Sequence, residues 1–159
     1  MLNEEFIEFL DHIFIEHQLQ AGDLIVECPL NLFMSLDEQG KAMVARINSI
    51  GIKVCVDGLG DSPIWLAKLP NLAVAYVKIA PSLTADFSHQ SHVRSLISGM
   101  VDMHNQQNAK VICEGVETLE QLNFVKSLNA YAAQGYYYSH PLSSVGMISW
   151  LKQWQIEHP

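Results

Sequence analysis

Six polar or charged residues stand at the ends of predicted strands in this sequence. They are Glu27, Asp57, Lys78, Glu114, Glu117 and Gln134. Because the C-terminal ends of parallel strands converge on one face of an α/β fold, one cleft would hold four carboxylates, a lysine and an amide. Crowded carboxylates need a cation, shared protons or water to persist together. Mg²⁺ or Mn²⁺ beside a lysine that orients water or stabilises phosphate charge is the chemistry of metal-assisted phosphodiester hydrolysis.

The same residues also have ordinary structural interpretations. Glu114 and Glu117 would stabilise the N-terminus of a helix beginning at Thr118 through their charge alone. Lys78 is compatible with a strand-end lysine that reaches water, and Glu27 with a solvated strand terminus. The individual residues therefore leave the choice between a site and a solvated sheet end open.

Apolar segments alternate with helical patterns along the whole chain. Strands are predicted at residues 24–28, 52–56, 74–79, 110–113 and 131–138. Helices are predicted at residues 3–20, 37–50, 64–69, 90–107 and 145–155, with one more that begins at Thr118 in a Thr-Leu-Glu-Gln capping box. Strands that are apolar on both faces and separated by helices are typical of a parallel sheet covered by helices. The predicted class is α/β, with residues 1–159 as a single domain.

The composition limits the classes of partner. The net charge is −8, from 17 acidic and 9 basic residues, and the bases are scattered, so the sequence disfavours DNA, RNA and anionic membranes. No apolar run approaches the roughly 20 residues that span a bilayer, and the N-terminus does not resemble a signal peptide, so we expect no membrane insertion and a cytoplasmic location. The three cysteines, Cys28, Cys55 and Cys113, have no metal-binding spacing and are expected to be reduced core thiols.

Several motifs occur together in a recognisable order. The stretch CEGVETLEQL, followed by QGYYYSHPL at residues 134–142, closely resembles the last part of the EAL family, the bacterial domains that hydrolyse or bind cyclic di-GMP. Lys78 and Ile79 fall on that family's Lys-Ile-Asp motif, and residues 57–60 fall on its Asp-Asp-Phe-Gly motif. Glu27 matches the glutamate that ends the family's fourth barrel strand. The resemblance extends over roughly residues 20–155.

The resemblance implies a fold and a role for each residue. The fold would be a partial (β/α)₈, TIM-barrel-like domain with roughly five parallel strands. Glu27 and Asp57 would be metal ligands, and Lys78 would orient the attacking water. Glu114 and Glu117 would be catalytic acids at or near the metals, and Gln134 would be a supporting amide that binds the ligand. Mg²⁺ or Mn²⁺ would be the cofactor if the site is functional.

The chain also departs from the family pattern. The Glu-Ala-Leu motif and a later asparagine ligand are not found, which suggests that the sequence begins near the family's midpoint. Gly58 replaces the second aspartate of the Asp-Asp-Phe-Gly motif, and Ala80 replaces the aspartate after Lys78 and Ile79. Pro63 stiffens the loop that follows. Since two-metal catalysis fails when metal ligands are lost, we expect little hydrolysis from this chain alone.

The predicted function is therefore that of a truncated, degenerate EAL-like domain in cyclic di-GMP signalling. It would act without catalysis, by binding a protein partner or the dinucleotide. The alternative is an Mg²⁺- or Mn²⁺-dependent cyclic di-GMP phosphodiesterase whose N-terminal half lies outside this chain. Because about five strands cannot close an eight-stranded barrel, we also expect a homo-oligomer or a protein partner.

Overall fold

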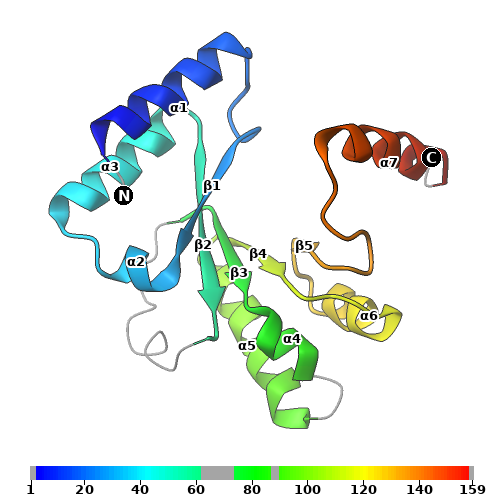
Figure 1. Cartoon of the computed structure of the whole chain (residues 1–159). Coiled ribbons are helices and arrows are strands. Elements are labelled where there is room, and N and C mark those ends of the chain that lie inside the picture. The colour runs from blue at the N-terminus through cyan, green and yellow to red at the C-terminus, as the bar shows by residue number, and fades with distance from the viewer. Residues whose placement is uncertain (1–2, 62–73, 87–89, 158–159) are drawn as a thin grey trace.

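A five-stranded parallel sheet forms the centre of the molecule. The computed structural model describes residues 3–61, 74–86 and 90–157. The strands follow one another across the sheet in chain order, each pairing in parallel with the next: β1 (Ile25–Pro29), β2 (Lys53–Leu59), β3 (Tyr76–Ile79), β4 (Lys110–Cys113) and β5 (Ala132–Ala133). The predicted α/β class with five parallel strands is confirmed. β1 and β5 are the two edges of the sheet (Figure 1).

Seven helices occupy the described part of the chain: α1 (Glu4–Glu16), α2 (Leu30–Met34), α3 (Glu38–Ser49), α4 (Pro81–Asp86), α5 (Ser91–Gln106), α6 (Leu119–Ser127) and α7 (Ser144–Glu157). Asn3 caps α1, since its side chain accepts a hydrogen bond from the Phe6 N–H at 2.9 Å. The capping box of α6 is also confirmed, between Thr118 and Gln121. None of the described helices is long and apolar enough to cross a bilayer.

Successive side chains of a strand point to opposite faces, so each strand of this sheet contributes to two different surfaces. On the helix-covered face the strands carry aliphatic or thiol side chains, of which Val26 is half-buried and the others are buried: Val26, Cys28, Val54, Val56, Val77, Ile79, Val111 and Cys113. α1 and α3 pack against β1 and β2 in one apolar cluster, and α5 and α6 pack against β3 and β4 in a second (Figure 1). This packing of aliphatic strands against amphipathic helices fixes the sheet.

The other side of the sheet, called the open face below, carries a different set of residues. The register places Glu27 beside Cys55, and Lys78 beside Ile112, on neighbouring strands. Near the N-terminal ends of β3 and β4, Lys110 lies over the Tyr131 ring at 4.3 Å and Tyr76 packs edge-on against the same ring. The open face therefore mixes charged, aromatic and small side chains with single aliphatic residues such as Ile112.

The last part of the chain differs from the prediction. A strand was expected over residues 131–138, but only Ala132–Ala133 pairs with β4, so that prediction is wrong in extent. The chain turns at Gly135, where a Cβ atom would lie 2.1 Å from the Val116 carbonyl oxygen. The Tyr138 N–H closes the turn on the Gly135 carbonyl at 3.1 Å. Close backbone contact with Val116 thus replaces extension of the strand.

Other boundaries also shift. The helix predicted over residues 3–20 ends at Glu16, because Gln18 adopts a left-handed conformation at φ 53°. The strand predicted over 52–56 continues to Leu59, and the one predicted over 74–79 starts only at Tyr76. The short helices α2 and α4 were not predicted. The helix predicted at 64–69 lies outside the described residues.

α7 lies apart from the sheet, beyond the edge strand β5 (Figure 1). None of its residues is buried. Its contacts with the body of the chain include an edge-on packing of Trp154 against Tyr138, with the ring centroids 5.8 Å apart. Trp150 and Trp154 stack on each other, with the ring centroids 5.1 Å apart.

Candidate functional site

Four of the six predicted site residues come from four neighbouring strands. Glu27 lies on β1, Asp57 on β2 and Lys78 on β3, and Glu114 directly follows β4. The strands are parallel and in register, and side chains alternate between the two faces along each strand. All four of these side chains point to the open face, so they meet at the C-terminal end of the sheet. The Glu114 N–H donates to the Ile79 carbonyl at 3.1 Å, which continues the β3–β4 pairing up to the site.

Glu27, Asp57, Lys78 and Glu114 are called the Lys78 group below, because Lys78 lies at its centre. Its Nζ lies 3.0 Å from Oε1 of Glu27 and 2.7 Å from Oε1 of Glu114. Only 4% of the Lys78 side chain is exposed, compared with 16% for Glu114 and 52% for Glu27. An ammonium group has three donors, and two of them therefore have carboxylate partners. The ion pair with Glu114 lies in the interior, whereas the pair with Glu27 reaches the surface.

The charges of this group depend on one another. Burial acts to lower the pKa of Lys78, but its hydrogen bonds to Glu114 and Glu27 raise the pKa by more, so the ammonium form is held. Burial raises the pKa of Glu114; the Lys78 ammonium opposes that rise, and the neighbouring Asp57 adds to it. The net direction for the Glu114 carboxyl is upward. Glu114 therefore takes up a proton more readily than an ordinary glutamate does.

Cys55 lies under this group on the open face, but it is not a candidate nucleophile. The side chain is fully buried, and burial together with the charge of Glu27 raises the pKa of the thiol to about 12. Burial raises the pKa of Cys113, on the other face, to about 12 as well. Because the thiolate is the reactive form, both cysteines are inert near neutral pH.

Glu117 and Gln134 lie elsewhere. Glu117 is exposed at the start of α6, and its backbone N–H donates to Oε1 of Gln121 at 2.6 Å. Gln134 is exposed after β5, where its N–H donates to the Cys113 carbonyl and its carbonyl accepts from Val116. The structure gives neither side chain a contact with Lys78, and the roles suggested for them remain predictions.

A divalent cation would need several oxygen ligands that face a common point. Here the Lys78 ammonium takes an oxygen of both Glu27 and Glu114, and the two replaced aspartate positions, Gly58 and Ala80, offer no side-chain ligand. Within residues 3–61, 74–86 and 90–157, no three His, Cys, Asp or Glu side chains are placed to hold a metal ion. The arrangement therefore does not fit a bound Mg²⁺ or Mn²⁺ unless Lys78 moves.

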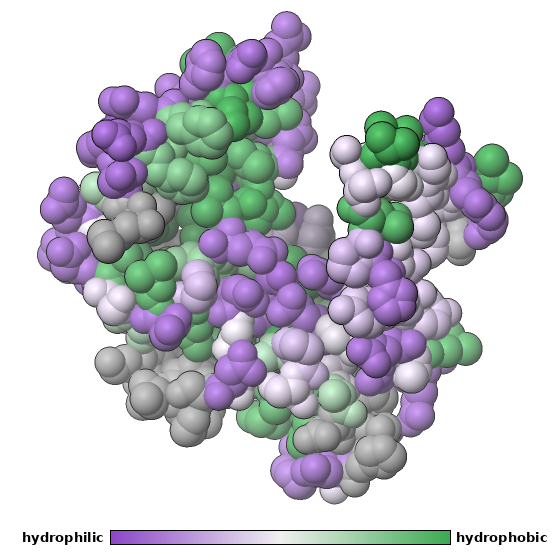
Figure 2. All heavy atoms as spheres, in the orientation of Figure 1, coloured by the Kyte–Doolittle hydropathy of each residue, from purple (hydrophilic) through white to green (hydrophobic). Residues whose placement is uncertain are grey.

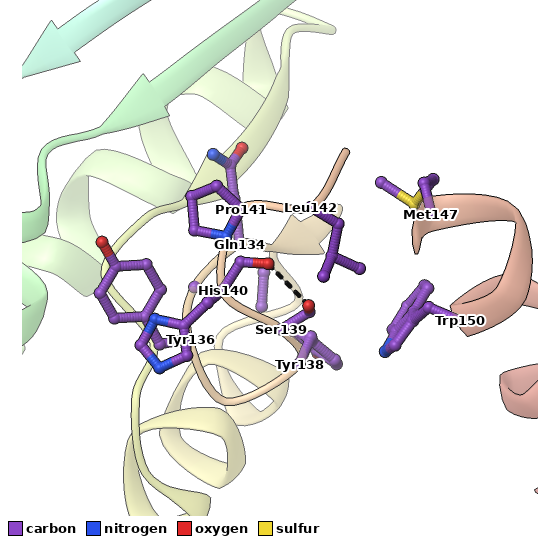
Figure 3. Close-up of a pocket in the computed structure, with 11 residues that line it drawn as sticks. Gln134, Tyr136, Tyr138, Ser139, His140, Pro141, Leu142, Met147 and Trp150 are labelled. Atoms are coloured by element: carbon purple, nitrogen blue, oxygen red, sulfur yellow. Dashed lines mark hydrogen bonds between the residues drawn. The ribbon is translucent and has the colours of Figure 1, made fainter. Parts of the chain in front are cut away.

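A second feature lies beside the group. A pocket of about 350 Å³ opens between the 134–142 loop and α7 (Figure 3). The rings of Tyr136 and His140 pack against each other at 4.2 Å on one side, and Met147 and Trp150 of α7 face them from the other side. These α7 residues were not predicted as part of a site; the three-residue spacing of Met147 and Trp150, about one helical turn, was the available sequence signal.

Curated relatives share the sequence pattern. The chain is 25% identical over 149 residues to the cyclic di-GMP phosphodiesterase NbdA of Pseudomonas aeruginosa, with 90% of this chain and 19% of the relative covered. It is 26% identical over 133 residues to the oxygen sensor protein DosP of Escherichia coli, with 84% of this chain and 17% of the relative covered. The chain thus spans about a fifth of the length of these relatives.

Solved structures share the fold. The EAL domain of Mycobacterium smegmatis DcpA superimposes with a TM-score of 0.86 at 21% identity, covering 96% of this chain and 69% of that chain. BlrP1 of Klebsiella pneumoniae, solved as a complex with manganese and cyclic di-GMP, superimposes with a TM-score of 0.79 at 19% identity, covering 87% of this chain and 36% of that chain. EAL domains are TIM-barrel-like (β/α)₈ structures, as predicted.

The family model of the EAL domain matches residues 1–141, which include the whole sheet and all four residues of the Lys78 group. This match confirms the family that the motifs indicated. The chain belongs to the EAL domain family.

Proposed function

We propose that this chain is a non-hydrolytic EAL module of bacterial cyclic di-GMP signalling, which acts by binding the dinucleotide or a protein partner. One observation carries the proposal: the Lys78 ammonium forms ion pairs with both Glu27 and Glu114, at 3.0 and 2.7 Å. The chain's own cation thereby competes with a divalent ion for one oxygen of each carboxylate. Gly58 and Ala80, in place of acids, further weaken the chain's capacity for metal-dependent hydrolysis.

The same geometry supports recognition of an anionic ligand. Among the described residues two of the three Lys78 donors have carboxylate partners, which leaves one for a phosphate oxygen or a water. The aromatic pocket of Tyr136, His140 and Trp150 lies beside the sheet end and offers ring surfaces. A ligand that combines phosphates with flat bases fits both features, and cyclic di-GMP has both.

The test combines calorimetry with product analysis. The 159-residue chain is titrated with cyclic di-GMP with and without Mg²⁺ or Mn²⁺, and the mixtures are then chromatographed. We expect heat of binding and unchanged dinucleotide in each condition. Lys78→Gln should weaken binding about tenfold, since it removes a charge-assisted contact. Lys110→Gln, a lysine at the opposite end of the open face, is the matched control and should bind normally. Linear product would refute the proposal, and absence of heat would leave only the protein-partner form of it.

A second candidate is an Mg²⁺- or Mn²⁺-dependent phosphodiesterase that is completed by further strands. It is favoured by the retention of Glu27, Asp57, Lys78 and Glu114 together on four neighbouring strands. In that case additional ligands would have to draw Glu27 and Glu114 away from Lys78. Hydrolysis by a completed barrel, combined with no hydrolysis by this chain, would support this candidate.

A further inference from the structure

A short turn connects β4 with α6 beside the Lys78 group. It consists of residues 114–118 and is called the 114–118 turn below. At its start the Glu114 carboxylate pairs with Lys78 at 2.7 Å, while the Glu114 N–H donates to the Ile79 carbonyl at 3.1 Å. In Figure 2 hydrophilic residues gather in the middle of the visible face, between the α1 side and the α7 side. A polar site depends on hydrogen bonds behind its side chains to hold them in place.

The middle of the turn holds the loop that carries Tyr136. Val116 is fully buried, its N–H donates to the Gln134 carbonyl at 3.1 Å, and its carbonyl accepts from the Tyr137 N–H at 3.0 Å. Residues of the same loop line the pocket in Figure 3. A shift of the turn would therefore move the ion-paired carboxylate at its start and the aromatic loop together.

Gln121, in the first turn of α6, ties the end of the 114–118 turn to α4. Its side chain is buried, with 9% of the residue exposed. Its Oε1 accepts from the N–H groups of Glu117 and Thr118, at 2.6 and 2.9 Å. Its Nε2 donates to the Thr84 carbonyl of α4 at 3.3 Å. A capping box requires only the contact with Thr118, so the contacts with Glu117 and Thr84 go beyond capping.

The turn also meets α4 at Gly115. This glycine has a φ of 70°, and a Cβ added to it would lie 2.6 Å from Cβ of Pro81, the first residue of α4. α4 follows β3, the strand that carries Lys78. The turn therefore rests on the continuation of the Lys78 strand, and the Gln121 amide acts across the same contact.

We propose that Gln121 is a positioning residue of the ligand site. Its amide holds the 114–118 turn on α4, which keeps the Glu114 carboxylate on Lys78 and fixes the Tyr136 loop relative to that ion pair. A ligand that contacts both parts then meets a site that is already arranged, which lowers the cost of binding. The effect on affinity rests on the proposed function, whereas the effect on the turn does not.

Amide hydrogen exchange, measured by NMR without ligand, tests the effect on the turn. Gln121→Met removes all three contacts, whereas Gln121→Glu keeps an acceptor for the turn and loses the donor to α4. We expect exchange at Glu114 and Val116 to be about tenfold faster in both variants. Exchange at Thr118 should rise in Gln121→Met and stay slow in Gln121→Glu. Unchanged exchange at Glu114 and Val116 in both variants would reduce Gln121 to a helix cap and overturn the proposal.

Two controls separate positioning from a general loss of stability. Thr84→Val removes a hydroxyl that has no hydrogen-bond partner among the described residues and keeps the carbonyl. Ile47→Val removes one methyl group from a fully buried residue of α3, in the other apolar cluster. We expect neither to speed exchange at Glu114. Equal acceleration in Ile47→Val and Gln121→Met would assign the effect to stability and overturn the proposal.

Calorimetry with cyclic di-GMP measures the consequence for the site, at a temperature where all variants are folded. Gln121→Met should weaken binding about tenfold, and Ile47→Val should bind as the wild-type chain does. Equal affinities of Gln121→Met and the wild-type chain would overturn the link between the turn and the site. If the wild-type chain gives no heat, the dinucleotide form of the proposed function fails, and the exchange pattern alone decides the role of Gln121.

Discussion

The two faces of the sheet are built from the same strands but have different roles. On β3, Val77 and Ile79 are buried among helices, while Lys78 between them faces the open side and pairs with two glutamates. On β2, Val54 and Val56 are core residues, while Asp57 joins the Lys78 group. A single residue step along either strand therefore changes the residue's role from packing to charge.

This difference indicates how substitutions on each face should affect stability. Removing a methyl group from the helix-covered face lowers the free energy of unfolding, because the side chains there are close-packed. The open face is held together by charge balance around Lys78, so its stability depends on pH and on which partner is changed. Substitutions on the two faces should therefore differ in both size and pH dependence.

The largest effect is expected on the helix-covered face. Ile79→Ala should lower the free energy of unfolding by about 2–5 kcal/mol, because Ile79 is fully buried and the cavity cannot be filled by water. Urea denaturation at neutral pH measures this. Ile25→Ala on the open face, where the side chain is partly exposed, is the control and should cost less than half as much. Equal costs would contradict the distinction between the faces.

Lys78→Met should have the next largest effect, about 1–3 kcal/mol at pH 8, because it leaves the Glu114 carboxylate buried without its cation. Without Lys78 only the causes that raise the Glu114 pKa remain, namely burial and Asp57. A folded-state pKa above the unfolded value costs stability as pH rises through it, so the variant should recover stability between pH 8 and pH 5. Denaturation curves at both values test this, and the double variant Lys78→Met with Glu114→Gln should abolish the recovery that protonation of Glu114 causes.

His104 should make the stability of the helix-covered face depend on pH. It is fully buried on α5, its Nδ1 lies 2.8 Å from the Met100 carbonyl oxygen, and its Nε2 has no hydrogen-bond partner among the described residues. Burial lowers its pKa below the ordinary 6.5, with the Met100 contact opposing. The unfolded chain therefore binds the proton first, and stability should fall as pH drops below about 6.5 toward the folded pKa.

Thermal melts of the wild-type chain and of His104→Gln, run from pH 7.5 to 5, measure this slope. We expect the variant to show a shallower loss of stability over that range. His12→Gln is the control, since His12 is exposed on α1 and should leave the slope as it is. An unchanged slope in His104→Gln would assign the acid sensitivity to other groups.

The smallest effect is expected from Glu27→Gln. Half of the Glu27 side chain is exposed, so its ion pair with Lys78 is screened and should contribute below about 1 kcal/mol. Glu114→Gln, which removes the more buried of the two ion pairs of Lys78, should cost more. Urea denaturation of the two variants side by side ranks the two ion pairs. A larger loss of unfolding free energy for Glu27→Gln would contradict the conclusion that the buried pair with Glu114 contributes more.

The sequence predicted the class and most elements because the strands are continuous apolar runs and the helices carry clear caps. It also indicated that Glu27, Asp57, Lys78 and Glu114 would come together, since each ends a strand of one parallel sheet. The placements of Glu117 and Gln134 were harder to predict, because Glu117 follows the bend at Gly115 and Gln134 precedes the turn at Gly135, and the direction of each bend depends on tertiary contacts. The short β5 has the same cause, namely the close approach of Gly135 to Val116.

The contact at Gly135 also sets a limit on mutational tolerance. Any side chain there would meet the Val116 backbone at three atoms, whose distances from a Cβ would be 2.1, 2.4 and 2.7 Å. Gly99, on the exposed side of α5, has no atom within 4 Å of an added Cβ and lacks such a limit. In a saturation library, position 99 should accept most residues, whereas position 135 should accept glycine alone.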